Sequence, residues 1–164
     1  MPQDLSPIDK AKFVAAKTAV DYVKSGMKVG IGTGSTAAWL VQCLGEKVRD
    51  EGLRIQGVPT STRTAQLARE VGIEVISLDE AKWLDLTIDG ADEYDGDFNL
   101  IKGGGALLQE KIVATASDQV IIIADVYKKV ETLGSFPLPV EVIPFGWQTT
   151  KTLIEETLIG LDVL

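Results

Sequence analysis

Short apolar runs alternate along the chain with segments that have helical periodicity. The apolar runs predict five strands, at residues 27–31, 54–58, 73–76, 84–88 and 120–124. Helical spacing, capping residues and terminal glycines predict helices over about 7–25, 36–49, 63–71, 81–83 and 106–116, with one more over 147–159. Strands and helices that alternate in this way indicate an α/β fold, in which a parallel sheet carries helices on both faces.

The pattern changes after Lys129. Residues 136–144 are predicted to be extended, because their prolines interrupt regular structure. Gly160 suits the C′ position of the helix that follows, and the apolar run 161–164 predicts the start of another strand. We therefore predict a Rossmann-like domain over residues 1–130 and the beginning of a small α+β domain over residues 131–164. The sequence is expected to stop inside this second domain.

Composition narrows the class of protein. A chain of 164 residues with 45% hydrophobic and 24% charged residues has the composition of a globular domain. The net charge of −8 disfavours nucleic acid as a partner, because phosphate backbones require a basic surface. No apolar run approaches the roughly 20 residues of a membrane span, and the amino end lacks the apolar core of a secretory signal.

Cysteine and histidine usage limits the available chemistry. The single Cys43 excludes an internal disulfide and fits a reducing compartment, so we predict a cytoplasmic location. The chain contains no histidine, which leaves no usual zinc constellation and no histidine-based triad. We predict no metal site and no cofactor. Acid–base chemistry then falls to Asp, Glu, Lys or Tyr.

The stretch from Asp89 to Lys111 concentrates such groups. Asp89 and Asp92 follow a predicted buried strand, Lys102 precedes three glycines, and Glu110 lies on the next predicted helix. Paired acids can hold different protonation states, and an ammonium beside exposed backbone N–H groups can stabilise an oxyanion. Simpler interpretations are an acidic turn for the aspartates and a surface lysine. On spacing alone, Glu110 is best explained as a surface residue with an i, i+4 partner.

A second glycine-rich turn, Gly32–Thr36, connects the first strand to its helix. Such a turn presents backbone N–H groups and hydroxyls at the positive end of a helix and can bind a phosphate. Gly32, Gly34 and Ala37 also fit a loose dinucleotide fingerprint. However, the second strand ends in residues 59–62, which contain no carboxylate to bind a ribose, so dinucleotide binding is the weaker interpretation. Simple close packing of helix and strand is a further alternative.

Apart from Glu110, which lies on a predicted helix, the polar groups of both stretches follow strands. In parallel α/β sheets, ligands bind beyond the carboxyl ends of the strands. One crevice is therefore expected to gather Gly32–Thr36, Asp89–Asp92, Lys102–Gly105 and the polar residues Asp125–Lys128.

Five motifs in order resemble the type A ribose-5-phosphate isomerase family. They are Gly32–Thr36, Asp89–Glu93, Lys102–Ala106, Glu110–Lys111 and Phe136–Val142. The resemblance implies metal-independent interconversion of ribose 5-phosphate and ribulose 5-phosphate through an enediolate, in the non-oxidative branch of the pentose phosphate pathway. It also implies a catalytic role for the domain at residues 1–130, a sugar-phosphate ligand and a homodimer or homotetramer. Members of this family continue beyond the position that matches Leu164.

The resemblance assigns roles to individual residues. It implies that Glu110 is the base that moves a proton between C1 and C2, that Asp89 assists ring opening, and that Lys102 faces the oxyanion. The positions that it assigns to substrate binding are Thr33, Gly34, Ser35, Thr36, Asp89, Gly90, Ala91, Asp92, Lys102, Gly103, Gly104, Gly105 and Lys128. The alternative is a non-catalytic sugar-phosphate-binding regulator on the same scaffold.

Overall fold

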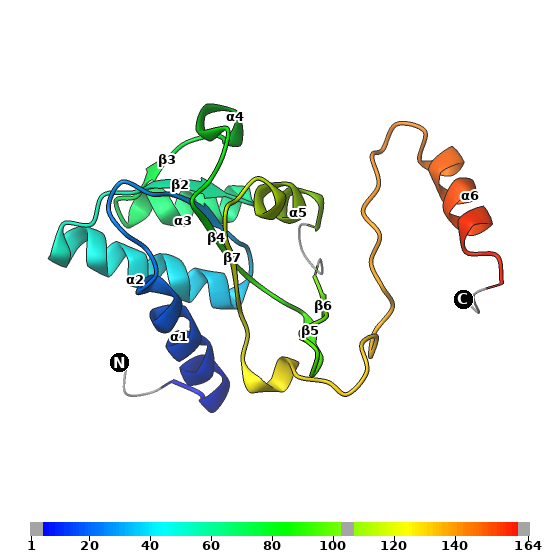
Figure 1. Ribbon diagram of the computed structural model, residues 1–164, viewed down its shortest axis with the longest axis horizontal. Helices are drawn as coiled ribbons and strands as arrows, with labels where there is room; N and C mark the ends of the chain where they lie inside the picture. The colour runs from blue at the N-terminus through cyan, green and yellow to red at the C-terminus, as the bar shows by residue number, and fades with distance from the viewer. Residues whose placement is uncertain (1–4, 103–106, 161–164) are drawn as a thin grey trace.

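A parallel sheet is the centre of the computed structural model, which describes residues 5–102 and 107–160 (Figure 1). Within these ranges five strands form the sheet in the order β3-β2-β1-β4-β7. Their bounds are β1 Lys28–Ile31, β2 Gln56–Pro59, β3 Glu74–Val75, β4 Leu86–Gly90 and β7 Val120–Ile123. Each corresponds to a strand predicted from the sequence, and the predicted α/β class is confirmed.

The predicted helices are also present. Their bounds are α1 Pro7–Val20, α2 Ser35–Glu51, α3 Thr62–Glu70, α4 Leu78–Ala81, α5 Leu107–Thr115 and α6 Trp147–Thr157, with the 3₁₀ turn η1 at Val126–Lys128. Ser6 and Ser61 cap α1 and α3 by accepting a hydrogen bond from a backbone N–H group three residues on. In the described part of the chain, no helix is both long and apolar enough to cross a membrane.

Three boundaries differ from prediction. Helix α1 ends at Val20, well before Gly26. Helix α6 ends at Thr157 with Leu158 as its C-cap, so Gly160, with φ of +88°, lies one residue beyond the C′ position that was predicted for it. Strand β4 extends further than predicted, because Asp89 and Gly90 continue the parallel pairing with β7. Asp89 is therefore part of a strand, and its assignment to the loop after the strand was wrong.

Helices cover both faces of the sheet, as predicted. On one face, α1, α2 and α3 pack on the strands through the main hydrophobic core. This core includes Phe13, Ala16, Val20, Val29, Ile31, Leu40, Leu44, Ala68 and Ile88. A smaller cluster on the other face joins Val58, Ala81, Leu84 and Val113, and thereby seats α4 and α5.

Gly30 allows α5 to approach the sheet closely. A Cβ atom at this position would lie 2.0 Å from the Thr87 hydroxyl oxygen and 2.8 Å from a methyl group of Val113. Real contacts of this kind are seldom shorter than about 3.4 Å, so a side chain here would push α5 away from the sheet. Since α5 carries Glu110, the glycine influences where that carboxylate lies.

A small hairpin follows β4 and was not predicted. Strands β5 (Glu93–Tyr94) and β6 (Leu100–Ile101) pair antiparallel. The predicted turn at residues 95–97 lies between them, and Asp95 accepts hydrogen bonds from the N–H groups of Asp97 and Asn99. Each strand has two residues, which is too short for a recognisable alternating pattern.

After η1 the chain runs as an extended segment to α6, which lies apart from the sheet in Figure 1. Helix α6 has no buried residue among those described. Large apolar side chains along this part are exposed, among them Ile143 at 67% and Phe145 at 93%. The division into domains at residue 130 stays a prediction.

Candidate active site

A pocket lies at the carboxyl ends of β1 and β4, where the strand order reverses direction. From β1 the chain proceeds to β2 and β3 on one side, whereas β4 and β7 lie on the other, and ligands of such sheets bind at this point. The pocket has a volume of about 310 Å³. Its lining is Thr33, Gly34, Ser35, Thr36, Gly90, Ala91, Asp92, Lys102, Glu110 and Lys128. The sequence predicted every one of these residues for catalysis or substrate binding.

The loop after β1 ends at the open amino terminus of α2. Gly34, with φ of +107°, is the N-cap residue, and no side chain among the described residues caps this helix. The first N–H groups of a long helix therefore face the pocket, with the positive end of the helix dipole behind them. Thr33 is held by a 2.7 Å hydroxyl contact with buried Thr60. This arrangement suits an anionic group such as a phosphate.

Lys102 lies between the two candidate acids. Its Nζ atom is 3.0 Å from Oδ2 of Asp89 and 3.6 Å from Oε2 of Glu110. It also donates a hydrogen bond to the carbonyl of Gly90. The lysine side chain is 18% exposed and lines the pocket together with Glu110, whereas Asp89 is not among the lining residues. One cation thus partly neutralises two buried carboxylates, and removal of the Lys102 ammonium would leave both of them without this compensation.

Asp89 is almost completely buried, with 1% of its surface exposed. Its Oδ1 atom accepts a hydrogen bond from the Gly90 N–H group, and its Oδ2 atom faces the Lys102 ammonium. Gly32 of the neighbouring loop provides the space for this carboxylate, since a Cβ there would lie 1.9 Å from Oδ1. The glycine-rich turn therefore leaves room for the Asp89 carboxylate as well as lining the pocket.

Glu110 is 5% exposed and reaches the pocket from the first turn of α5. Burial raises its pKa above the ordinary value, and the negative charge of Asp89 raises it further. The positive charge of Lys102 opposes both effects. The interpretation of Glu110 as a surface residue, which spacing favoured, was wrong. Packing of α5 against the sheet turns this side chain inward.

Asp92 and Lys128 line the mouth of the pocket from different segments. Asp92 follows β4, and its N–H group donates to the carbonyl of Ile101 at 2.8 Å. Lys128 ends η1, a turn capped by the buried carboxylate of Asp125. Gly103, Gly104 and Gly105, also predicted for substrate binding, lie outside the described residues.

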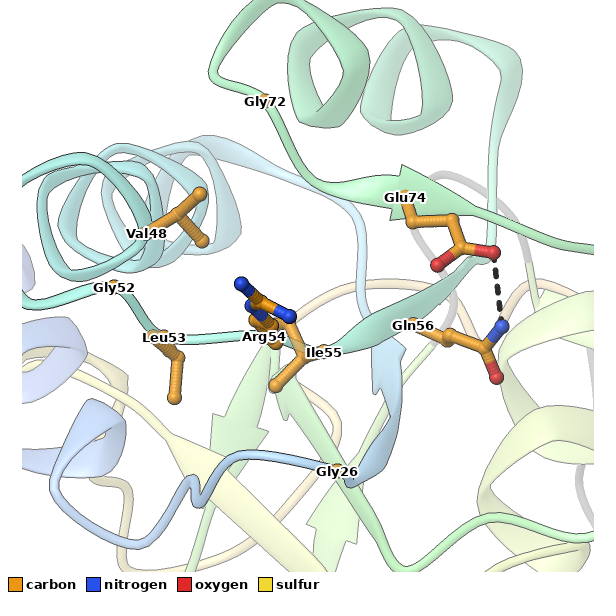
Figure 2. Close-up of a pocket in the computed structure, with 9 residues that line it drawn as sticks. All are labelled: Gly26, Val48, Gly52, Leu53, Arg54, Ile55, Gln56, Gly72 and Glu74. Atoms are coloured by element: carbon orange, nitrogen blue, oxygen red, sulfur yellow. Dashed lines mark hydrogen bonds between the residues drawn. The ribbon is translucent and has the colours of Figure 1, made fainter.

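A larger hollow of about 580 Å³ lies at the opposite, amino edge of the sheet (Figure 2). It is lined by Val48 of α2 and by residues that precede or begin β1, β2 and β3, with Arg54 and Glu74 as its charged groups. Glu74 already accepts a hydrogen bond from Gln56. This hollow lacks a group of acids around a cation, and we place the candidate site in the smaller pocket.

Two further carboxylates near the pocket were not singled out from the sequence. Glu93 and Glu141 each accept hydrogen bonds from distant backbone N–H groups. Neither has a spacing that signals such a role. Across residues 5–102 and 107–160, no three His, Cys, Asp or Glu side chains gather as a possible metal site.

A family model and curated relatives both indicate one family. The family model for ribose 5-phosphate isomerase A (phosphoriboisomerase A) matches residues 56–163. Ribose-5-phosphate isomerase A of Ruegeria pomeroyi is 78% identical over the whole of this chain, which spans 63% of that relative.

Solved structures give the same result. Ribose 5-phosphate isomerase A from Methanocaldococcus jannaschii has a TM-score of 0.84 and 41% identity, over 91% of this chain and 67% of that one. A D-ribose-5-phosphate isomerase in complex with phospho-erythronic acid has the same TM-score and identity, over 94% of this chain and 67% of that one.

Proposed function

The chain belongs to the ribose 5-phosphate isomerase A family, and we propose that it interconverts D-ribose 5-phosphate and D-ribulose 5-phosphate. The observation that carries this proposal is the group formed by Asp89, Lys102 and Glu110 at the base of one pocket. The Glu110 carboxylate lines the pocket, which supports a role as the base, and the Lys102 ammonium lies 3.6 Å from it.

The proton transfer proceeds in two steps. The Glu110 carboxylate removes the proton from C2 of the open-chain aldose, and the electron pair moves to the carbonyl oxygen to form an enediolate. Glu110 then returns the proton to C1, while a hydroxyl proton moves from O2 to O1, so that the ketose has the same atoms as the aldose. A raised pKa makes Glu110 a stronger base than an ordinary glutamate.

Lys102 and Asp89 support this chemistry. The Lys102 ammonium stabilises the negative charge that develops on O1 and O2, in a partly buried site where such an interaction is strong. Asp89 exchanges the hydroxyl proton needed for ring opening. Its contact with Lys102 keeps both side chains in place.

The rest of the pocket suits a sugar phosphate. The open amino end of α2 at residues 34–36 binds the phosphate, with Lys128 as the partner cation. Asp92 accepts hydrogen bonds from the sugar hydroxyls. The relative solved in complex with phospho-erythronic acid also has a phosphorylated sugar derivative as its ligand.

Replacement of Glu110 by Gln tests the proposal. The variant keeps the shape of the side chain but removes the base, and rate losses of about 10²–10⁴ follow from loss of a general base. Isomerisation is followed as ketose formation, and proton exchange by NMR of the substrate in D₂O. We expect both to be lost while substrate still raises the melting temperature. Glu51→Gln, at the exposed end of α2, is the control.

Two results would contradict the proposal. Exchange at the wild-type rate in Glu110→Gln would remove Glu110 as the base. Saturable binding of ribose 5-phosphate without turnover by the wild-type protein would favour the non-catalytic regulator.

We further propose that the protein is a cytoplasmic homodimer or homotetramer. The exposed side chains of Ile143 and Phe145 support association, because apolar surface of this kind is usually covered. The lone Cys43, which is buried, is consistent with a reducing compartment. Sedimentation analysis measures the oligomeric state, and a monomer at micromolar concentration would contradict this part of the proposal.

A further inference from the structure

Two glutamates outside the pocket fasten the segment that follows Lys128. Glu93 lies in β5, directly after Asp92, and Glu141 lies in the extended segment before α6. Glu93 binds the beginning of this segment, and Glu141 connects its later part to α5. We call residues 134–141 the strap.

Glu93 holds the strap with both carboxylate oxygens. Its Oε2 atom accepts from the N–H group of Gly134 at 2.7 Å. Its Oε1 atom accepts from the N–H group of Ser135 at 3.2 Å and from the Ser135 hydroxyl. Glu93 is 4% exposed, so these donors replace the water that the carboxylate loses on folding. These hydrogen bonds lower the pKa of Glu93 below its usual value. The bond from the Ser135 hydroxyl has the largest effect, and the bond from the Gly134 N–H group has the next largest.

This contact fixes two residues of the pocket relative to each other. Asp92 precedes Glu93 directly, and Lys128 precedes the segment that Glu93 binds. Between them, the chain runs beside β5, where the Val130 N–H group donates to the carbonyl of Tyr94 at 2.9 Å. Without the Glu93 contacts, this short pairing and the pairing of β4 with β7 would still connect the two walls of the pocket, but the beginning of the strap would no longer be held beside Asp92.

Glu141 acts on the opposite wall. Its Oε2 atom accepts from the N–H group of Leu108 at 2.6 Å, in the first turn of α5. A carboxylate in this position satisfies a helix N–H group and interacts favourably with the helix dipole. Glu110 lies two residues further along the same turn. The strap is thus bound at one end to the Asp92 side of the pocket, and its other end holds the helix of the proposed base.

We propose that Glu93 and Glu141 are positioning residues, which set the two walls of the pocket through the strap. This inference rests on the proposed function, because it assigns effects on substrate binding to Asp92 and Lys128 and effects on proton transfer to Glu110. Neither glutamate touches the pocket. They act through the residues that do.

The two contacts predict different kinetic effects. Asp92 and Lys128 bind substrate in the ground state and transition state alike, so loss of Glu93 raises KM more than it lowers kcat. Glu110 acts in the chemical step, so loss of Glu141 lowers kcat with little change in KM. A general loss of folded protein would lower the apparent kcat and leave KM unchanged, so it cannot produce the rise in KM expected for loss of Glu93. For Glu141, rescue of kcat by Gln at equal folded fraction, measured by circular dichroism, separates positioning from unfolding.

The variants follow from the geometry. Glu93 accepts on both oxygens, so Glu93→Gln places an amide NH₂ group against backbone donors and breaks the contact. Glu141 accepts on one oxygen, so Glu141→Ala removes the bond but Glu141→Gln can retain it. Asp95→Asn is the matched control for Glu93, because Asp95 lies on the same hairpin and also accepts with both oxygens, from Asp97 and Asn99.

Steady-state isomerisation of ribose 5-phosphate is measured on the whole chain, at a temperature where circular dichroism shows every variant folded. We expect Glu93→Gln to raise KM about tenfold, which corresponds to roughly 1.4 kcal/mol, and Asp95→Asn to leave it unchanged. Glu141→Ala lowers kcat by a similar factor, and Glu141→Gln restores it. Ser135→Ala removes one donor to Glu93 and is expected to raise KM by a smaller factor. This variant tests the inference if Glu93→Gln does not fold.

Other outcomes would overturn the inference. The first is that Glu93→Gln and Asp95→Asn have equal KM values and that Ser135→Ala does not change KM. The second is that Glu141→Gln and Glu141→Ala lower kcat equally. Wild-type protein without turnover would remove the proposed function, and this inference with it. Active wild-type protein with unaffected variants would remove this inference alone.

Discussion

Replacement of Gly32 by Ala tests the close contact between the glycine-rich loop and the buried acid. The new Cβ would lie 1.9 Å from Oδ1, 2.2 Å from Cγ and 2.7 Å from Cα of Asp89. The first two atoms could rotate away, but the Cα atom belongs to β4, which pairs with β1 and β7 on both sides. The loop or Asp89 must therefore move.

The expected cost follows from two opposing effects. Overpacking of a rigid interior costs about 1–3 kcal/mol. Gly32 does not have a positive φ angle, so alanine fits its backbone conformation and would otherwise stabilise the protein by about 0.4–1 kcal/mol through the unfolded state. The remaining loss of roughly 1–2 kcal/mol corresponds to a decrease of about 2–8 °C in melting temperature for a chain of this size. Activity falls as well, because Asp89 and Lys102 lose their alignment.

Gly96→Ala is the matched control, since Gly96 has no atom within 4 Å of its ideal Cβ and no positive φ angle. Denaturant unfolding and ketose formation are measured for both variants. We expect Gly96→Ala to have wild-type stability or slightly more, with wild-type activity. Equal stability and activity of the two variants would refute the reasoning, because it would mean that Asp89 does not occupy the space beside Gly32.

Two further predictions concern pH. Asp89→Asn removes a negative charge that raises the pKa of Glu110, so the acid limb of the remaining kcat/KM profile shifts to lower pH, and ¹³C NMR of the Glu110 carboxyl shows the same shift; an unchanged or higher pKa would contradict the predicted coupling. The pKa of Glu93 is lower in the folded protein than in the unfolded chain, where it is near 4.5. The contribution of Glu93 to stability is therefore fully present above the unfolded-state pKa and is lost as pH falls through the folded-state pKa of Glu93. The stability difference between wild type and Glu93→Gln should therefore be largest near neutral pH and decrease in acid, as measured by urea unfolding from pH 7 to pH 3; a difference independent of pH would contradict this.

The sequence alone determined the order of the sheet strands and helices along the chain, without the hairpin of β5 and β6, and the edge of the sheet at which the pocket lies. Apolar runs and helical spacing repeat within a few residues, because one face of each helix or strand is buried, so they can be recognised without a structure. The glycine-rich turn at residues 32–36 and the polar residues after β4 follow from the same pattern, because parallel strands bring their carboxyl ends to one edge. Resemblance to a family then named the residues that line the pocket.

Only the tertiary structure decided how deeply the carboxylates are buried and which groups they contact. Glu110 has the spacing of a surface residue, and only the packing of α5 on the sheet buries it beside Lys102. Asp89 belongs to β4 because β7, far along the chain, extends the pairing. Glu93 finds its donors 41 and 42 residues away. Such contacts depend on the path of the whole chain, and no local pattern of hydrophobic and polar residues records them.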